Sequence, residues 1–359
     1  MIYLDYQATT PLAPEAREAM LPLLGGLEST GFGNPHSPHR LGRMAAAAVE
    51  VAREQVAALF PPGGRVIFTG SATEALNLAI FGTRPARIAH SAIEHAAVID
   101  TAKASGAAVD VIPVGADGLV GADMAIAEGT ALVAVMQVNN EIGTIQPVEA
   151  MADAAHRVGA LFLCDAVQGA GKLAAPVNAD MIAVSAHKLY GPKGIGALWL
   201  RDGLEIEPLI HGGGQEQGLR SGTLSPALCA GFGAAAKVAL ETADEDAAHI
   251  ETLWSNARDI LSDWTLSGSA EHRWHGNLNL RRDGLDVARL MSDQRDIAFS
   301  AGSACAGGSG RPSHVLRALG LTDAQAKSSI RLGFGRYTSA PELEDACVRL
   351  DAAAKAQGV

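Results

Sequence analysis

The sequence is poor in several features that define whole classes of protein. It contains no long polar or low-complexity tract, and only 19% of its 359 residues are charged, whereas 48% are hydrophobic. This composition excludes a disordered chain and predicts a folded protein with a large buried core. Basic residues are outnumbered, with 28 Lys and Arg against 39 Asp and Glu, so the formal net charge is −11. Broad nucleic-acid binding needs a basic face and is therefore not expected, although a local basic patch for an anionic cofactor is compatible with this charge.

Signals for membranes and for export are also missing. No apolar run approaches the roughly 18–20 residues that a membrane-spanning helix needs. The first residues, MIYLDYQATTPLAPEA, contain neither the basic segment nor the apolar segment of a secretory signal peptide. We therefore expect a cytoplasmic protein.

Cysteine is scarce, and none of the four cysteines belongs to a CxxC pair. A zinc or iron–sulfur site built by this chain alone is therefore not expected, and neither is a disulfide framework. Cys164 follows the apolar run ALFL, while Cys229 and Cys347 lie in Ala-rich sequence of helical character, so all three are predicted to be packed in the core. Cys305 differs, because the surrounding GSACAGGSGRP predicts a loop, and a free cysteine in a loop is a candidate for reactivity.

Between about residues 43 and 240, short apolar runs alternate with helical stretches. The predicted strands are 65–70, 86–90, 131–138, 160–165, 181–186 and 194–200, and the predicted helices include 71–82, 91–106 and 148–159. Continuous apolar strands in this βαβ rhythm predict an α/β fold, with a mostly parallel sheet and helices on both of its faces.

The pattern changes after about residue 240. Long helical sequence over 239–264 is followed by strand-like pieces at 275–281 and 328–335, which is typical of an α+β domain. Because cores tend to divide beyond roughly 250–300 residues, we expect two domains. The large one spans 13–240. The small one comprises 1–12 and 241–359, since the strand-like IYLDY at the start needs a partner, and it carries the Cys305 loop.

Polar residues gather where the predicted strands end, which is where open α/β sheets bind ligands. Ser71 and Glu74 have capping-box spacing, so a helix is predicted to begin there, and its N-terminus suits a phosphate. The alternative is an ordinary turn between strand and helix. Asp165 ends a buried strand, with Gln168 three residues later. A buried carboxylate needs a partner, such as a cationic pyridinium nitrogen, a structural salt bridge or a helix cap.

The stretch MIAVSAHKLYGPKGIG is the most informative one in the chain. A strand ends in Ser185, Ala186, His187 and Lys188, and a Gly-rich turn follows. Lys188 adjoins apolar sequence, and desolvation there would favour its amine for Schiff-base chemistry. Ser185 and His187 could donate to a phosphate. A solvated surface lysine rarely has such neighbours.

This stretch resembles the lysine motif of cysteine desulfurases of the NifS/IscS type, within the class V aminotransferase-like group of fold-type I enzymes that use pyridoxal 5'-phosphate (PLP). The resemblance is collinear and covers nearly the whole chain. Its other segments are YLDYQATTP (3–11), FGNPHSPHRLGR (32–43), TGSATEALNLAI (69–80), EHAAVID (94–100), QVNNEIGTIQP (137–147), CDAVQGAGK (164–172), HGGGQEQGLRSGT (211–223), GSACAGGSGRPSHVLRALG (302–320) and SSIRLGFGRYT (328–338). The resemblance implies the PLP-dependent transferase fold of type I.

The resemblance also implies site residues. Lys188 would bind the cofactor covalently, Asp165 would pair with the pyridine nitrogen, and Gln168 would bond the phenolic oxygen. His95 would stack on the ring and transfer protons. The other cofactor contacts implied are Ala72, Thr73, Asn140, Ser185 and His187, with Thr73, Ser185 and His187 on the phosphate. Thr223 would reach the phosphate of the neighbouring subunit's cofactor, which implies a homodimer.

For the substrate, the resemblance implies that Arg331 clamps the carboxylate through a two-pronged bond, with Asn140 also in contact. Cys305 would accept sulfur from L-cysteine, leaving L-alanine and a persulfide for a sulfur-acceptor or iron–sulfur scaffold protein. No resident metal ion is implied, only transient contact of Cys305 with a nascent cluster.

Alternatives remain for single residues and for the whole chain. His95 could be a helix-start residue satisfied by backbone, Arg331 could form a structural ion pair, and Asn139 could take the part of Asn140. A selenocysteine lyase or an aminotransferase would use the same Lys188, and a silent scaffold would use none of this chemistry. The intact set of Lys188, His95, Asp165 and Cys305 favours the desulfurase. General iron–sulfur assembly, nitrogenase maturation and tRNA thiolation all stay open as destinations of the sulfur.

Overall fold

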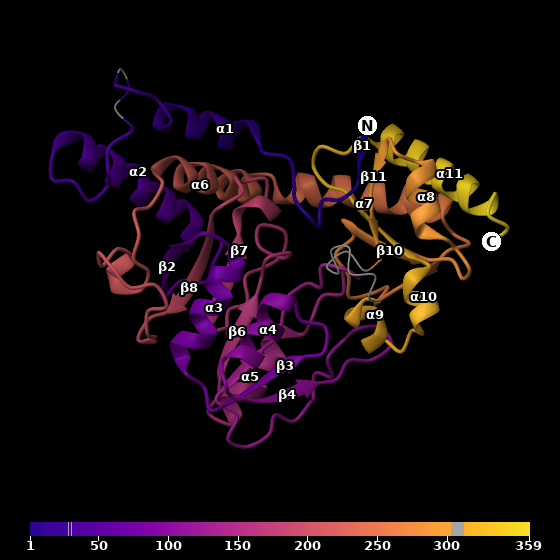
Figure 1. The fold of residues 1–359 in the computed structure, drawn as a ribbon, viewed down its shortest axis with the longest axis horizontal. Helices are drawn as coiled ribbons and strands as arrows, with labels where there is room; N and C mark the ends of the chain where they lie inside the picture. The colour runs from indigo at the N-terminus through magenta and orange to yellow at the C-terminus, as the bar shows by residue number, and fades with distance from the viewer. Residues whose placement is uncertain (28, 30, 303–311) are drawn as a thin grey trace.

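The structure is a computed structural model that describes residues 1–27, 29, 31–302 and 312–359. Its largest element within these residues is a seven-stranded sheet (Figure 1). In spatial order its strands are β2 (Gly64–Thr69), β8 (Gly196–Arg201), β7 (Met181–Ser185), β6 (Leu161–Asp165), β5 (Leu132–Ala134), β3 (Arg87–Ser91) and β4 (Ala108–Ile112). Strand β8 is antiparallel to β2 and β7, and the other neighbouring strands are parallel. The expected α/β fold with a mostly parallel sheet is therefore confirmed.

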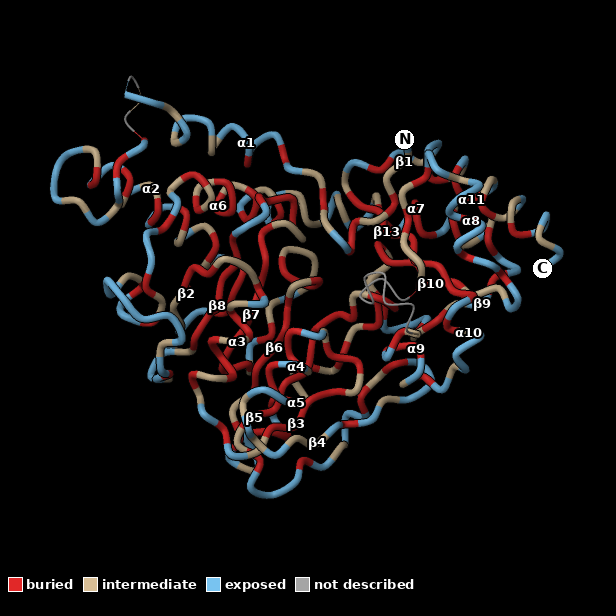
Figure 2. The backbone as a smooth tube through the Cα atoms, in the orientation of Figure 1, coloured by how far each residue is buried: buried red, intermediate tan, exposed pale blue. Residues whose placement is uncertain are grey.

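Alternating side chains of each strand face two hydrophobic clusters, one on each side of the sheet. Val66 and Phe68 of β2 lie in one cluster, and Ile67 between them lies in the other. Helices of the first cluster are α1 (Pro14–Met20), α2 (Arg40–Ala57), α5 (Val148–Arg157) and α6 (Pro226–Glu241), and those of the second are α3 (Ala72–Thr83) and α4 (Ala96–Ala104). Because successive strand residues point to opposite faces, helices cover both, and the central strands between them are buried (Figure 2).

Two smaller sheets lie beside this body, among the C-terminal helices (Figure 1). A four-stranded antiparallel sheet has the order β12 (Ser300–Ala301), β13 (Ser329–Gly333), β10 (Asn277–Arg281) and β9 (Thr265–Leu266). The N-terminal strand β1 (Ile2–Tyr3) pairs in parallel with β11 (Ile297–Ala298). The helices here are α7 (Ala243–Ile260), α8 (Val287–Asp293), α9 (His314–Ala318), α10 (Asp323–Lys327) and α11 (Ala340–Lys355).

Several predicted boundaries shift for identifiable reasons. The helix expected over 91–106 begins at Ala96, because the side chain of His95 caps it by accepting the backbone N–H of Ala97. The strand expected over 131–138 is assigned only to Leu132–Ala134, and its continuation turns back at Asn139, whose carbonyl accepts the N–H of Gly143. Ser71 caps α3 as expected, but Glu74 bonds the N–H of Gly70 instead of closing the capping box.

Candidate active site

One edge of the large sheet brings together the carboxyl ends of β2, β6 and β7 and the start of β8, because β8 runs in the opposite direction to the other three. A cavity of about 380 Å³ opens there. Among the predicted site residues, its lining includes Ala72, Thr73, His95, Asn140, Asp165, Gln168, Ser185, His187, Lys188 and Arg331. Segments from both ends of the chain thus converge on one cavity.

One side of the cavity is the N-terminus of α3. Ser71 turns the chain into the helix and accepts the N–H of Glu74 at 3.3 Å, so Ala72 and Thr73 occupy the first turn, whose N–H groups have no intrahelical acceptors. Gly196 of β8 permits this approach, since a Cβ there would lie 2.6 Å from the carbonyl carbon of Ser71 and 2.8 Å from the nitrogen of Ala72. This turn is therefore a cradle shaped for an anionic group.

Beside this cradle, η2 (Ala186–Lys188) follows β7 and carries His187 and Lys188. The ammonium of Lys188 donates to the carbonyl oxygens of Gln7 and Ala8, the latter at 2.7 Å. Burial, reinforced by the positive charge of Lys188, lowers the pKa of His187 to about 4. His187 is consequently neutral near pH 7 and contributes hydrogen bonding rather than charge.

The middle of the cavity is lined by Asp165, Gln168 and His95. Burial raises the pKa of Asp165, although His95 and the backbone N–H of Val167 at 3.0 Å counteract this. A cation placed beside this buried carboxyl would stabilise its charged form. Gln168 donates from Nε2 to the carbonyl of Gln7 at 3.0 Å, while its buried Oε1 has no hydrogen-bond partner among the described residues.

His95 has a defined ring orientation. Its Nδ1 accepts the backbone N–H of Ala97 at 3.1 Å, so the neutral ring carries its proton on Nε2. His95 thus caps the start of α4 through Nδ1, as the alternative from sequence suggested. The same ring also lines the cavity.

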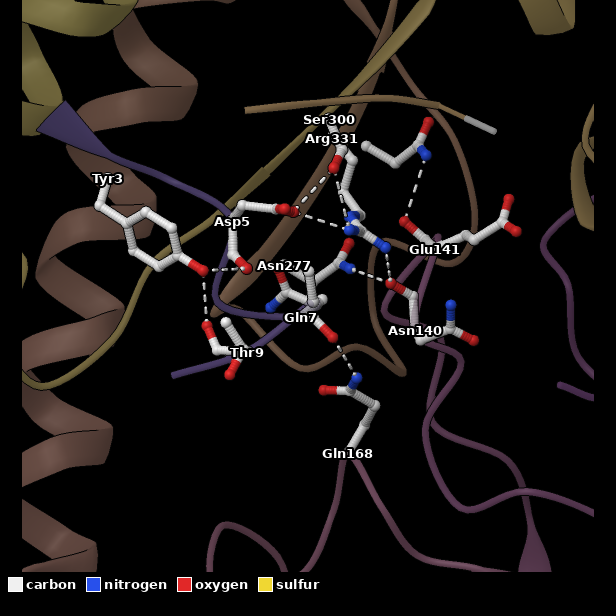
Figure 3. Close-up of polar contacts among 12 residues, drawn as sticks. Tyr3, Asp5, Gln7, Thr9, Asn140, Glu141, Gln168, Asn277, Ser300 and Arg331 are labelled. Carbon is white, nitrogen blue, oxygen red and sulfur yellow. Dashed lines mark hydrogen bonds and ion pairs between the residues drawn. The ribbon is translucent and has the colours of Figure 1, made fainter. Parts of the chain in front are cut away.

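At the remaining side lies Arg331, whose side chain is 2% exposed. Nη1 donates to the carbonyl of Asn140 at 3.0 Å, and Nη2 donates to Asp5 Oδ1 at 2.8 Å and to Ser300 Oγ at 3.3 Å (Figure 3). The ion pair that the sequence left open as an alternative therefore exists, and its carboxylate also faces the cavity. Nε of Arg331 is buried without a partner among the described residues.

The two neighbouring asparagines have different surroundings. The side chain of Asn139 hydrogen-bonds to backbone groups: it donates to the carbonyl of Ile93 and accepts the N–H groups of Glu141 and Ile142. Asn140, in contrast, lines the cavity. The preference for Asn140 over Asn139 as a site residue is consistent with this placement.

Two predicted site residues remain. Thr223 is exposed and absent from the lining of the cavity, and Cys305 lies outside the described residues. The other cysteines are buried, as predicted. Burial raises the pKa of both Cys229 and Cys347 to about 12 and also raises that of Cys164, so these three thiols are poor nucleophiles.

Sequence reasoning missed Asp5, Gln7 and Ser300 as cavity residues. The motif YLDYQATTP contains the first two, but its sequence indicates a strand and a segment of the family resemblance without marking either residue as part of a site. Across the described chain, no cluster of three or more His, Cys, Asp and Glu side chains is arranged to hold a metal ion. Likewise, no described helix combines the length and apolarity needed to cross a bilayer.

The described residues fit PLP. The first turn of α3 suits a phosphate, and buried Asp165 suits a protonated ring nitrogen. The buried Oε1 of Gln168, which has no partner among the described residues, can bond a polar atom of the ring. Lys188 at the same cavity supplies an amine for a covalent bond.

Comparison with known proteins agrees with this geometry. The family model for Aminotransferase class-V matches residues 2–345. Cysteine desulfurase IscS of Rickettsia bellii (strain OSU 85-389) is 41% identical over 366 residues, covering 96% of this chain and 88% of that protein. A solved structure described as a NifS-like protein superposes with a TM-score of 0.88 and 32% identity, covering 98% of both chains. Another, described as SspA in complex with cysteine, has a TM-score of 0.80 and 34% identity, covering 94% of this chain and 100% of that one. This chain therefore belongs to the class-V aminotransferase family.

Proposed function

We propose that this chain is a PLP-dependent cysteine desulfurase that converts L-cysteine to L-alanine and leaves the sulfur as a persulfide on Cys305. The proposal rests above all on the cavity in which Lys188, Asp165 and Arg331 meet. Its support is the family membership together with relatives named cysteine desulfurase at about 40% identity over nearly the whole chain. Bound PLP supplies an electron-withdrawing ring that stabilises negative charge on the substrate α-carbon.

The protein's own residues would bind and orient the reactants. The first turn of α3, with Ala72 and Thr73, together with Ser185 and His187, would hold the phosphate. Asp165 would accept a hydrogen bond from the protonated ring nitrogen. Burial disfavours the charged form of its carboxyl, and a neighbouring cation offsets that cost. Arg331 would bind the substrate carboxylate, with Asn140 beside it.

Two groups would move protons. Lys188, as the neutral amine, would take the proton from the substrate α-carbon, since its side chain lines the cavity and its Nζ lies within hydrogen-bonding distance of the carbonyls of Gln7 and Ala8. His95 would exchange a proton at Nε2, the nitrogen left open by the bond from Ala97 to Nδ1. Gln168 would bond the phenolic oxygen of the ring.

The sulfur step would then use Cys305. Its thiolate attacks the substrate sulfur, an S–S bond forms while the Cβ–S bond breaks, and the electron pair of the broken bond stays on carbon. Proton delivery to that carbon gives alanine, and the persulfide remains on the protein. Cysteine and one enzyme thiol are thus converted to alanine and one enzyme persulfide.

We further propose the wider setting of the enzyme. Thr223 is exposed and outside the cavity, as a residue serving the cofactor of a second subunit would be, and this supports a homodimer. The persulfide would pass to a sulfur-acceptor or iron–sulfur scaffold protein in the cytoplasm. The division into a large domain of 13–240 and a small one of 1–12 with 241–359 is supported by the separate hydrophobic clusters beneath the large and the small sheets.

The test measures alanine released from L-cysteine in the presence of a thiol acceptor. The wild-type protein should release alanine, and both Lys188→Ala and Cys305→Ala should lose most of this activity. Cys347→Ala is a matched control that removes a buried thiol remote from the chemistry and should retain activity. Unchanged alanine release by Cys305→Ala would rule out the desulfurase and favour an aminotransferase or a lyase that needs no enzyme thiol.

A further inference from the structure

The cavity contains its own carboxylate at the place where a substrate carboxylate is expected. Asp5 Oδ1 accepts from Nη2 of Arg331 and from Oγ of Ser300, both at 2.8 Å (Figure 3). Arg331 is 2% exposed and Asp5 is 21% exposed, and both line the cavity. The positive charge of Arg331 is thus compensated by Asp5 before any substrate binds.

A tight turn holds Asp5 in this position. The hydroxyl of Tyr3 donates to the carbonyl of Thr9 at 2.8 Å and to that of Asp5 at 3.2 Å (Figure 3). The N–H of Ala8 donates to the carbonyl of Asp5 at 2.9 Å. Asp5 also forms a parallel bridge with Gly333, two residues beyond Arg331 on β13. The turn and β13 are therefore joined through backbone as well as through the ion pair.

This arrangement has a consequence for binding. A guanidinium that holds Asp5 on one nitrogen can still offer Nε and its remaining N–H groups to a second carboxylate. Two carboxylates on one guanidinium lie within roughly 4–6 Å of each other and repel, strongly where water is scarce. Conversely, removing Asp5 would leave a buried arginine that gains more from any incoming carboxylate.

We propose that Asp5 is a specificity-determining residue that competes with the substrate carboxylate for Arg331 and thereby weakens the binding of the amino-acid substrate and of its alanine product. The proposal rests on the proposed function, in which Arg331 is the carboxylate-binding group. Asp5 compensates the positive charge of the buried arginine and orients its side chain in the free enzyme, and it favours release of alanine after each turnover.

The test compares Asp5→Asn with wild-type holoprotein. Asparagine keeps an oxygen for Arg331 and Ser300 but removes the charge. L-Alanine and L-alaninamide, which differ in the carboxylate, are titrated while the cofactor absorbance is followed. The Kd for L-alanine should fall about tenfold in Asp5→Asn, and the Kd for L-alaninamide should change less than about twofold. The KM for L-cysteine should fall in parallel, without a rise in kcat.

Asp293→Asn provides a matched control, because it makes the same chemical change at an exposed ion pair with Arg289 on α8. Equal or weaker binding of L-alanine by Asp5→Asn would overturn the proposal. Failure of the proposed function itself has a different signature, since wild-type protein would then release no alanine from L-cysteine. If Asp5→Asn does not fold alone, saturating L-alanine should restore folding and L-alaninamide should not; restoration by neither would likewise overturn the proposal.

Discussion

Glu94 offers a sharp test of how burial shapes this site, because the substitution Glu94→Gln should stabilise the protein. Its side chain is 0% exposed, next to His95 in sequence. Oε1 accepts from Ser91 Oγ at 2.5 Å and from the N–H of Met136 at 2.8 Å, whereas Oε2 has no partner among the described residues. Burial raises the pKa of Glu94 from 4.5 to about 8.

The magnitude follows from proton linkage. Between pH 4.5 and 8 the folded protein binds a proton at Glu94 that the unfolded chain has released, so the free energy of unfolding falls as pH rises, by about 1.4 kcal/mol per unit. At pH 7 this loss amounts to about 3 kcal/mol. Glutamine does not titrate, keeps the acceptor for Ser91 and Met136, and matches the shape of the protonated acid. The advantage of Glu94→Gln should thus be near zero below pH 4.5, grow with pH, and level off above pH 8.

Urea unfolding of both proteins at several pH values between about 5 and 8 measures this difference. Glu128→Gln is the control, because it makes the same chemical change at an exposed position. The reasoning is refuted if Glu94→Gln is less stable than wild type at pH 7, or if its advantage is independent of pH.

Three further predictions concern the cavity. Gly196→Ala should weaken PLP binding by at least about tenfold, because the added Cβ displaces the first turn of α3; PLP titration of cofactor-free protein measures this, and unchanged affinity would contradict the cradle. Arg331→Gln should raise the KM for L-cysteine by about 30- to 150-fold, as expected for a charged bond worth about 2–3 kcal/mol, and an unchanged KM would remove Arg331 from substrate binding. His187→Asn should weaken PLP binding yet leave the pH profile of kcat unchanged between about pH 6 and 9, since His187, with its pKa lowered to about 4, is already neutral there; a shifted profile would disprove this.

The sheet was predictable because its central strands are buried on both faces and therefore read as continuous apolar runs. Strand β4 was not predicted, since it lies at the edge of the sheet and all its residues except Ile112 are exposed or only partly buried, so its sequence AVDVI lacks such a run. Likewise, only Ile2 and Tyr3 of the strand-like IYLDY pair as a strand, because the chain enters the tight turn at Asp5.

The cavity residues that follow strands, such as Asp165 and Lys188, were found from sequence because parallel strands bring their carboxyl ends to one edge. Asp5 could not be found in this way. Its partner Arg331 is 326 positions away, and the contact depends on how the N-terminal turn meets β13. No periodicity in the sequence encodes such an approach.

The most direct test of the proposed function is to locate the sulfur. Wild-type holoprotein is treated with L-cysteine, its free thiols are blocked, and its peptides are analysed by mass spectrometry. One extra sulfur should be found on the peptide that contains Cys305, and none on those that contain the buried Cys164, Cys229 and Cys347. Alanine formation with no extra sulfur on Cys305 would contradict the account.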